Sequence, residues 1–245
     1  MPSDPDAVLP DPDAVPVDSD AVLPDPDAVP VDSDAVLPDP EAVLLDLDGT
    51  LVDTEGAWWR AVAGVAAASL GRRLEEADVP HVRGRTAADA AAHLLLPSSA
   101  PGAAVAALAE RLVDAFAERL ARDGVPVLPG ARELLADLAA ASIPTALVSA
   151  SPRRVVELVL PCLRHSFHLV VADGETARGK PYPDPYLEAA RRLGAAPERC
   201  VAVEDSPAGV AAATAAGCRV LVTGPAGPPS LARIRACLAA SEGAL

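Results

Sequence analysis

The chain has 245 residues, enough for one large domain or for a core domain with a smaller insertion. Hydrophobic residues make up 51% of it, but there are only two Trp, two Tyr and two Phe, so the core must be built mainly from Val, Leu and Ala. The net charge is −15, yet residues 1–41 alone carry twelve acids and no Lys or Arg, which leaves residues 42–245 at −3. A folded part this close to neutral, without a basic patch, argues against a nucleic-acid partner.

The cysteine pattern and the hydropathy of the chain predict a cytoplasmic protein. The cysteines contain no C-x-x-C pair, so we interpret them as reduced core residues of a cytosolic protein. No apolar run reaches the length of a membrane span, and the N-terminus has neither the basic start nor the apolar segment of a signal peptide. We therefore expect no membrane partner, and a monomer by default.

Residues 4–45 repeat every seven residues, with units such as DPDAVLP, DPDAVPV and DSDAVLP. Proline in nearly every unit excludes a helix interior, and with it a coiled coil. Residues 1–41 hold ten prolines and no base, so we predict a disordered, acidic, Pro-rich heptad-repeat tail. Its units place Ala-Val where the turn described next has Gly-Thr, so they should not form further sites, and deleting residues 1–38 should leave kcat unchanged.

The first predicted strand covers residues 42–45, a short apolar run that suits burial on both faces. Two aspartates, Asp46 and Asp48, follow it directly, and the chain then turns at Gly49 and Thr50. An acid at the end of a buried strand is costly unless it is paired. Two acids this close repel each other, so a bound cation is their natural partner.

Residues 56–125 carry helical periodicity without a strand signal. Helices are predicted at 58–70, which Gly71 ends, at 87–96, which a capping box of Thr86 and Asp89 opens, and at 102–122. The region therefore predicts an all-helical insertion.

From residue 130 onward, helices and strands alternate. Ser151 and Pro152 are expected to cap and start the helix at Arg153. Strands separated by helices predict right-handed crossovers and a doubly wound parallel sheet, an α/β fold with a core of residues 42–55 and 126–245. The predicted strands are 144–149, 169–172, 200–203 and 219–222, and the predicted helices are 131–141, 153–160, 184–193, 208–216 and 230–240.

Parallel topology places the carboxyl ends of the strands at one edge, where such sheets bind ligands. Acids at several of these ends suit a divalent cation such as Mg²⁺, and a serine with a nearby lysine, Lys180, suits phosphoryl oxygens. The polar residues expected at this edge are Asp46, Asp48, Ser149, Asp173, Glu204 and Asp205.

Four motifs carry a resemblance to a known family. D-L-D-G-T-L-V-D-T at 46–54 resembles the first motif of the haloacid-dehalogenase-like (HAD) hydrolases, which are mostly phosphatases. L-V-S-A-S at 147–151 resembles the second motif, G-K-P-Y-P-D-P-Y at 179–186 the third, and V-A-V-E-D-S-P-A-G-V at 201–210 the fourth. Their order and spacing fit the family over nearly all of residues 42–223, and they imply a Rossmann-like HAD core.

The resemblance implies a reaction in two steps. Asp46 would attack phosphorus and form an aspartyl-phosphate. Asp48 would protonate the leaving alkoxide and then take a proton from the hydrolytic water.

The resemblance also implies how charge is handled. Mg²⁺ would be bound by Asp46, Asp205 and the backbone carbonyl of Asp48, with Glu204 either a ligand or behind one. Ser149 would donate to the phosphate, and Lys180 would offset phosphoryl and aspartate charge. Thr50, grouped with the phosphate-binding residues, would hold the turn that aims Asp48, although a purely structural capping role is equally compatible.

The helical insertion resembles the mobile cap domain of the family, with hinges near residues 54–57 and 123–127. V-R-G-R-T at 82–86 resembles its substrate-facing loop, which makes Arg83, Gly84 and Arg85 candidates for substrate specificity. Glu55 either contacts the substrate or braces the hinge. Trp58 and Trp59 are interpreted as packing residues.

The same resemblance limits the alternatives. A mutase of the β-phosphoglucomutase type typically has a histidine twelve positions beyond the nucleophile, where this chain has Trp58. Dehalogenases lack the acid that is present here as Asp48, and a phosphonate hydrolase would need a cap lysine, which residues 56–125 lack. We expect a Mg²⁺-dependent phosphomonoesterase of a small sugar- or polyol-like phosphate. The mutase, and a non-catalytic binding protein on the same fold, remain alternatives, and the substrate stays open.

Overall fold

The computed structural model describes residues 38–95, 102–224 and 226–239. All of them belong to one compact unit, Leu37–Leu245. The predicted tail of residues 1–41 lies almost entirely outside the described residues, and its predicted disorder stays a prediction. None of the helices in the described ranges is both long and apolar enough to span a membrane.

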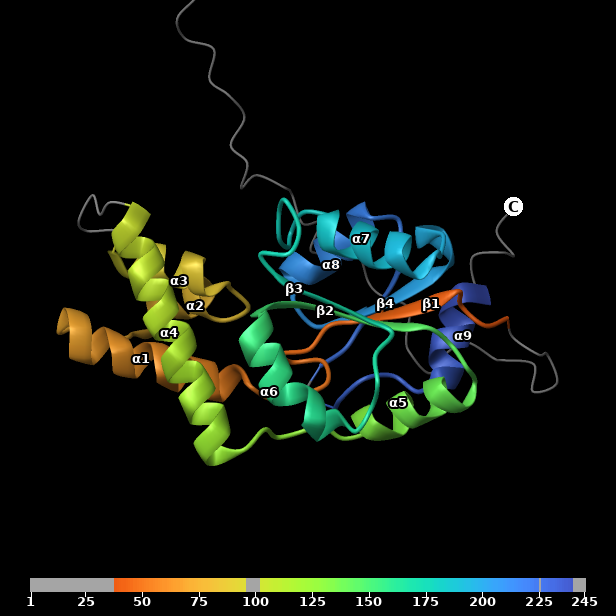
Figure 1. The fold of residues 1–245 in the computed structure, drawn as a ribbon, viewed down its shortest axis with the longest axis horizontal. Coiled ribbons are helices and arrows are strands. Elements are labelled where there is room, and N and C mark those ends of the chain that lie inside the picture. Colours follow the sequence, from red (N-terminus) through yellow and green to blue (C-terminus); the bar gives the residue numbers. More distant parts are fainter. Residues whose placement is uncertain (1–37, 96–101, 225, 240–245) are drawn as a thin grey trace, which may run out of the picture. The chain divides into compact units, whose positions relative to one another are not determined.

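A parallel sheet forms the centre of the fold, with β1 in its middle (Figure 1). In the described residues the strand order is β3-β2-β1-β4-β5, and every pairing is parallel. This topology confirms the predicted doubly wound α/β fold. The strands are β1 (Ala42–Leu45), β2 (Thr145–Pro152), β3 (Leu169–Asp173), β4 (Cys200–Glu204) and β5 (Arg219–Val222).

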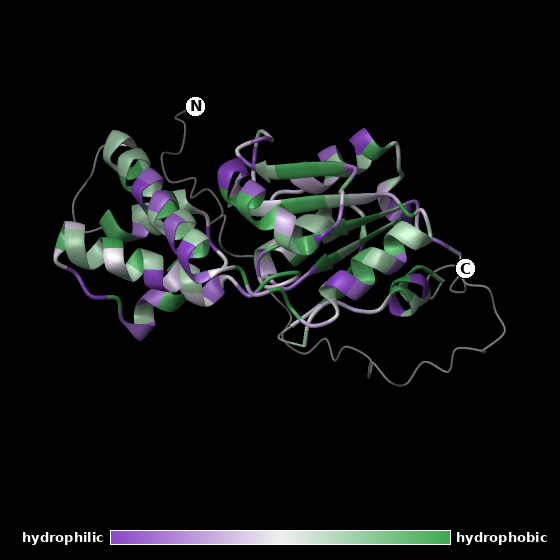
Figure 2. Cartoon of the chain, turned by 60° about the horizontal axis from the view of Figure 1, so that its bottom comes forward, coloured by the Kyte–Doolittle hydropathy of each residue, from purple (hydrophilic) through white to green (hydrophobic). Residues whose placement is uncertain are grey.

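Helices cover both faces of the sheet, because successive residues of a strand point to opposite sides. Val43 and Leu45 of β1 belong to one buried cluster, and Ala42 and Leu44 to the other. The first cluster is closed by α5 (Ala131–Ala140), α6 (Arg153–Leu163) and α9 (Leu231–Ala239), and the second by α7 (Asp184–Leu193) and α8 (Pro207–Ala215). Figure 2 shows long hydrophobic stretches in the strands, whereas the helices beside them alternate between hydrophobic and hydrophilic residues.

An insertion between β1 and β2 is built, in its described residues, from helices and short loops, with no strand among them (Figure 1). The long helix α4 packs against α1 and α3, and the rings of Trp58 and Phe116 meet edge to face at 5.4 Å. The insertion contains α1 (Glu55–Leu70), the 3₁₀ turn η1 (Glu76–Asp78), α2 (Val79–Val82), α3 (Ala87–Leu95) and α4 (Gly102–Asp123).

The two chain crossings into the insertion are hydrogen-bonded to each other. The Asp53 amide donates to the Pro126 carbonyl at 2.8 Å, and the Leu128 amide donates to the Leu51 carbonyl at 2.9 Å. The segments predicted as hinges are therefore neighbours in space. The domain boundaries at residues 56 and 125 stay predictions.

One local prediction is confirmed and another is wrong. The capping interaction at α3 is present, because the Asp89 amide donates to Thr86 Oγ1 at 3.1 Å. Ser151 and Pro152, however, do not cap α6 through a side chain. Together with Ala150 they extend β2 by three residues past Ser149, and the Ser151 hydroxyl donates to Asp48.

Candidate active site

Lys180 joins the residues that the sequence placed at separate strand ends. Its Nζ donates to Asp46 Oδ1 at 2.6 Å, to Glu204 Oε1 at 2.5 Å and to the Val148 carbonyl at 2.9 Å. Asp46 follows β1, Val148 lies in β2 and Glu204 ends β4. The parallel sheet thus brings distant segments to its carboxyl edge, as predicted.

Lys180 is the only lysine of the sequence, and its side chain is 5% exposed. Burial by itself lowers the pKa of Lys180, but the carboxylates of Asp46 and Glu204 outweigh it and raise that pKa above the ordinary value. Lys180 is therefore a permanent cation in contact with two acids.

The acids at this edge outnumber the cation. Burial raises the pKa of Asp46 well above its usual range, Glu204 raises it further, and Lys180 offsets part of the effect. Burial, followed by the charge of Glu204, raises the pKa of Asp205 to about 7. One ammonium ion is too little for three clustered carboxylates, so the cluster favours a further cation.

The donor set fits a divalent metal ion. One oxygen from each of Asp46, Glu204 and Asp205 lies within 4.8 Å of the others, and oxygen ligands suit Mg²⁺. The backbone at Gly49 is packed against Asp205, because a Cβ at Gly49 would lie 1.9 Å from Asp205 Oδ2. Gly49 also has φ +92°, which favours glycine.

Glu204 differs from the other two acids because its oxygens are already used. Oε1 accepts from Lys180 and, at 2.6 Å, from the Tyr186 hydroxyl. Oε2 accepts from the Asp205 amide and from both the amide and the hydroxyl of Ser206, at 3.1 to 3.3 Å. Glu204 was expected either to bind the metal directly or to support residues that surround it. These bonds favour the supporting role, in which Glu204 holds Lys180 and the start of α8. Asp46 and Asp205 are then the candidate side-chain ligands of a metal ion.

Hydroxyl groups hold Asp48. Thr54 Oγ1 donates to Oδ1 at 2.5 Å, and Oδ2 accepts from Ser151 Oγ at 2.8 Å and from Ser149 Oγ at 3.4 Å. Neither Thr54 nor Ser151 had been assigned to the site from sequence, although both lie within the quoted motifs. Ser149, predicted to donate to phosphate, sits beside them with its side chain near Asp48.

Thr50 packs against Asp205, which suits the purely structural role left open for it. It is fully buried, and its hydroxyl donates to Asp205 Oδ1 at 3.4 Å. It is not among the described residues that line the cavity above the site. In this structure Thr54 is the threonine that orients Asp48, because Thr54 lies on the far side of the turn, at the start of α1.

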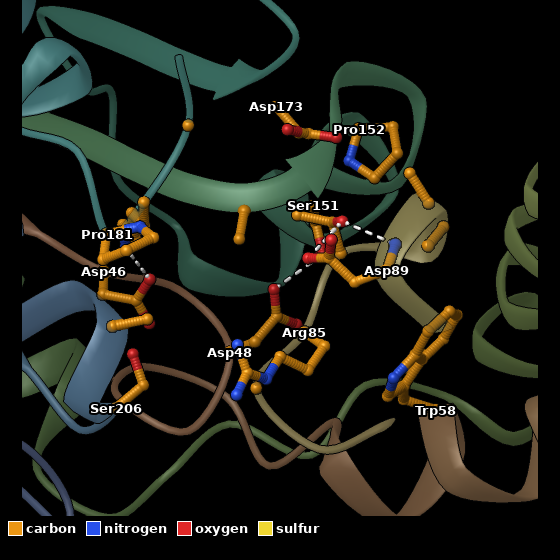
Figure 3. A pocket seen from close by; sticks show the side chains of 18 of the residues that line it. Asp46, Asp48, Trp58, Arg85, Asp89, Ser151, Pro152, Asp173, Pro181 and Ser206 are labelled. Atoms are coloured by element: carbon orange, nitrogen blue, oxygen red, sulfur yellow. Dashed lines mark hydrogen bonds and ion pairs between the residues drawn. The ribbon is translucent and has the colours of Figure 1, made fainter. Parts of the chain in front are cut away.

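A cavity of about 470 Å³ lies above these residues (Figure 3). The core contributes Asp46, Asp48, Lys180 and Asp205 to its wall. The helical insertion contributes further residues, which are Glu55, Trp58, Gly84, Arg85, Thr86, Ala87, Ala88, Asp89, Val113 and Phe116.

The candidate specificity residues differ in whether they line the cavity. Gly84 and Arg85 line the cavity, whereas Arg83 is not among the described lining residues. Arg83 instead lies 3.7 Å from the Glu55 carboxylate and over the ring of Trp59. The sequence could not distinguish Arg83 from Arg85, because the turn at Gly84 decides which of them faces the cavity.

Glu55 and Trp58 connect the insertion to the core edge. Glu55 lines the cavity and also accepts from the Gly84 amide at 3.2 Å. This geometry is compatible both with a contact to the substrate and with bracing of the hinge. The Trp58 indole donates to the Val82 carbonyl at 2.8 Å, which agrees with packing, but its ring also forms part of the cavity wall.

Known proteins match this chain in sequence and in structure. Residues 40–217 match the family described as haloacid dehalogenase-like hydrolase. Hexitol phosphatase A of Escherichia coli is 42% identical over 116 residues, which are 44% of this chain and 51% of that protein. CbbY from Rhodobacter sphaeroides, solved with phosphate, has a TM-score of 0.67 at 29% identity, covering 78% of this chain and 88% of that one. β-Phosphoglucomutase from Clostridium difficile shares the fold, with a TM-score of 0.71 at 21% identity and coverages of 83% and 99%.

The fold and the site together define an α/β protein with a carboxylate and lysine site at the carboxyl edge of a parallel sheet. Because the family match covers more than half of the sequence, the chain belongs to the haloacid dehalogenase-like hydrolase family. The chain spans about half the length of hexitol phosphatase A.

Proposed function

We propose that this protein is a Mg²⁺-dependent phosphomonoesterase of a small sugar- or polyol-like phosphate, acting through an aspartyl-phosphate. The observation that carries the proposal is the pairing of Asp46 with the buried ammonium of Lys180, beside a second aspartate, Asp48, in the wall of the same cavity. Hexitol phosphatase A, a phosphatase by its name, supports the same class.

In the first step, an oxygen of Asp46 forms a bond to phosphorus while the bond from phosphorus to the leaving oxygen breaks. Asp48, protonated at the start, gives its proton to that leaving oxygen, so an alcohol departs rather than an alkoxide. Lys180 offsets the negative charge of Asp46 and of the incoming phosphoryl group, which otherwise repel each other.

In the second step, water attacks the phosphorus of the aspartyl-phosphate, and Asp48 takes the proton of that water. The phosphorus–Asp46 bond breaks and inorganic phosphate leaves. Thr54 and Ser151 keep the Asp48 carboxyl in one orientation during both transfers, because each donates a hydrogen bond to one of its oxygens. Ser149 is proposed to donate to a phosphoryl oxygen, since its hydroxyl lies beside Asp48.

A metal ion would complete the charge balance of the site. Asp46 and Asp205 would hold it, with the Asp48 carbonyl as a further predicted ligand and Glu204 behind them. Mg²⁺ bound there supplies Lewis-acid neutralisation of the phosphoryl oxygens.

Residues 56–125 are proposed to act as a cap that excludes water and contacts the leaving group through Gly84, Arg85 and Glu55. A cytoplasmic, monomeric protein without nucleic-acid or membrane partners remains our prediction.

A panel of phosphorylated metabolites, assayed for phosphate release with and without Mg²⁺, tests the proposal, and Asp46→Asn serves as the blank. Release that requires Mg²⁺ and disappears in the blank supports it. Interconversion of sugar phosphates without net release would establish the mutase alternative instead. An absence of any turnover, with binding retained, would favour the non-catalytic reading and refute the proposal.

A further inference from the structure

Two carboxylates lie on the side of the cavity remote from Asp46. Asp89 comes from the first turn of α3 in the insertion, and Asp173 ends β3 in the core. Figure 3 shows both on the opposite side of the cavity from Asp46, with Pro152 beside Asp173. We call Asp89 and Asp173 the distal acids. Since the reacting phosphate belongs at Asp46, the distal acids face whatever the phosphate is attached to.

The distal acids are close enough to influence each other. Burial raises the pKa of Asp173, a backbone hydrogen bond from Gly174 lowers it, and the charge of Asp89 raises it again. Neither acid has an ion-pair partner among the residues that the structure describes. This side of the cavity therefore carries negative charge that the protein leaves unneutralised.

The arginines nearest in sequence to this wall are occupied by other acids. Arg153 forms a two-point pair with Glu175 at 2.7 and 2.6 Å, and Arg178 forms one with Asp184 at 3.2 and 2.9 Å. Arg85 lines the cavity without a carboxylate partner among the described residues, but Figure 3 shows it well apart from Asp173. Arg178 also lines the cavity, but its guanidinium is already paired with Asp184. Among the described residues, no arginine without a carboxylate partner therefore lies beside Asp173 to receive a second anionic group.

Hydrogen-bond capacity remains at both acids. A carboxylate has about four acceptor positions, whereas the described residues give Asp173 one backbone donor and give Asp89 the Thr86 hydroxyl at 2.8 Å. Hydroxyl groups of a substrate would supply the missing donors. A phosphate or carboxylate at the same place would be repelled by both acids.

We infer that Asp89 and Asp173 select a substrate whose leaving group is neutral and rich in hydroxyls, and disfavour substrates with a second phosphate or a carboxylate. The inference rests on the proposed phosphatase function and names the substrate class of that site. Asp173 is the better residue to mutate, because Asp89 also forms hydrogen bonds with Thr86 at the start of α3.

Two compounds that differ only at the distal end test the inference. Glucitol 6-phosphate and 6-phosphogluconate have the same six-carbon chain, ending in a hydroxymethyl group in one and in a carboxylate in the other. The wild-type protein should favour the first in kcat/KM. In Asp173→Asn with Asp89→Asn, the preference should shrink by roughly tenfold, mainly through faster turnover of 6-phosphogluconate. Asp137→Asn, at an exposed position of α5 outside the cavity lining, makes a matched change of charge and should leave the ratio unchanged.

para-Nitrophenyl phosphate, which carries no distal charge, distinguishes a failure of the inference from a failure of the proposed phosphatase function. If it is hydrolysed but the wild type prefers 6-phosphogluconate, or the ratio is the same in the distal variants, the inference is overturned while the phosphatase stands. A preference for glucosamine 6-phosphate over both compounds would overturn the neutral leaving group in favour of a cationic one. If no ester is hydrolysed, the proposed function fails, and the inference with it. Retained turnover of para-nitrophenyl phosphate by Asp173→Asn shows that the variant is folded.

Discussion

Replacing Lys180 with methionine tests the arrangement at the centre of the site. Methionine keeps a long apolar stem but removes the ammonium that contacts Asp46 and Glu204 at 2.6 and 2.5 Å. Both acids are almost fully buried, so solvent cannot replace the lost partner. Removing one member of a buried ion pair typically costs about 3–5 kcal/mol, and we expect a loss of that size in the free energy of unfolding at pH 8 without Mg²⁺.

The catalytic loss should be separate and of similar size. Deleting one group that stabilises developing charge costs roughly 3–4 kcal/mol at the transition state, or about 10²- to 10³-fold in kcat. Urea unfolding measures the first quantity, and hydrolysis of para-nitrophenyl phosphate measures the second. Arg191→Met is the matched control, because Arg191 pairs with Glu188 on the surface of α7 and such pairs contribute at most about 1 kcal/mol.

A Lys180→Met protein with wild-type stability and turnover would show that the Lys180 ammonium is not needed for either. A direct check is also available, because Lys180 is the only lysine and isotope-labelled lysine gives a single side-chain signal by NMR. That signal should stay in the charged form past the ordinary lysine pKa of 10.5, since the two carboxylates raise it. Titration below that value would contradict the ion-pair geometry.

Further predictions follow from the same site. Because the folded-state pKa of Asp205 is raised to about 7, its contribution to stability is present at low pH and is lost as pH rises from about 4 through 7. Without Mg²⁺, the free energy of unfolding measured by chemical denaturation should therefore fall over this range, by a few kcal/mol at most since Asp205 is only partly buried, and Mg²⁺ should reverse the fall at pH 8; a free energy of unfolding insensitive to both would contradict the assignment. Gly49→Ala should destabilise by about 2–4 kcal/mol and weaken the Mg²⁺ dependence of turnover, because it combines a strained φ with a clash at Asp205; unchanged melting would show that the turn relaxes freely. Thr54→Val should lower kcat roughly tenfold or more with little effect on unfolding, because the hydroxyl holds Asp48 and does not cap α1; equal kcat would remove Thr54 from the site.

Much of the fold could be predicted from the sequence because its signals are local. The apolar run at 42–45, the glycine that ends α7 and the pairing of Thr86 with Asp89 each depend on neighbouring residues. Alternation of helices and strands then predicts a parallel sheet, and a parallel sheet brings strand ends to one edge. Asp46, Lys180 and Asp205 were expected together for that reason, and the structure places them together.

The tertiary structure decided which atom contacts which. The extra residues of β2 carry Ser151 to Asp48, and the turn after β1 buries Thr50 against Asp205 while Thr54 reaches Asp48. The same holds for Glu204, whose oxygens are saturated by donors from several elements.

It also decided the surroundings of the substrate. The turn at Gly84 directs Arg85, and not Arg83, toward the cavity, and the folding of α3 near the end of β3 brings together Asp89 and Asp173, which are 84 positions apart in the sequence. Local patterns fix where a strand or helix begins and ends, but side-chain direction and long-range packing fix the hydrogen bonds. Local signals were thus enough to predict the fold class and the residue types at the candidate site, whereas their partners followed only from the packed structure.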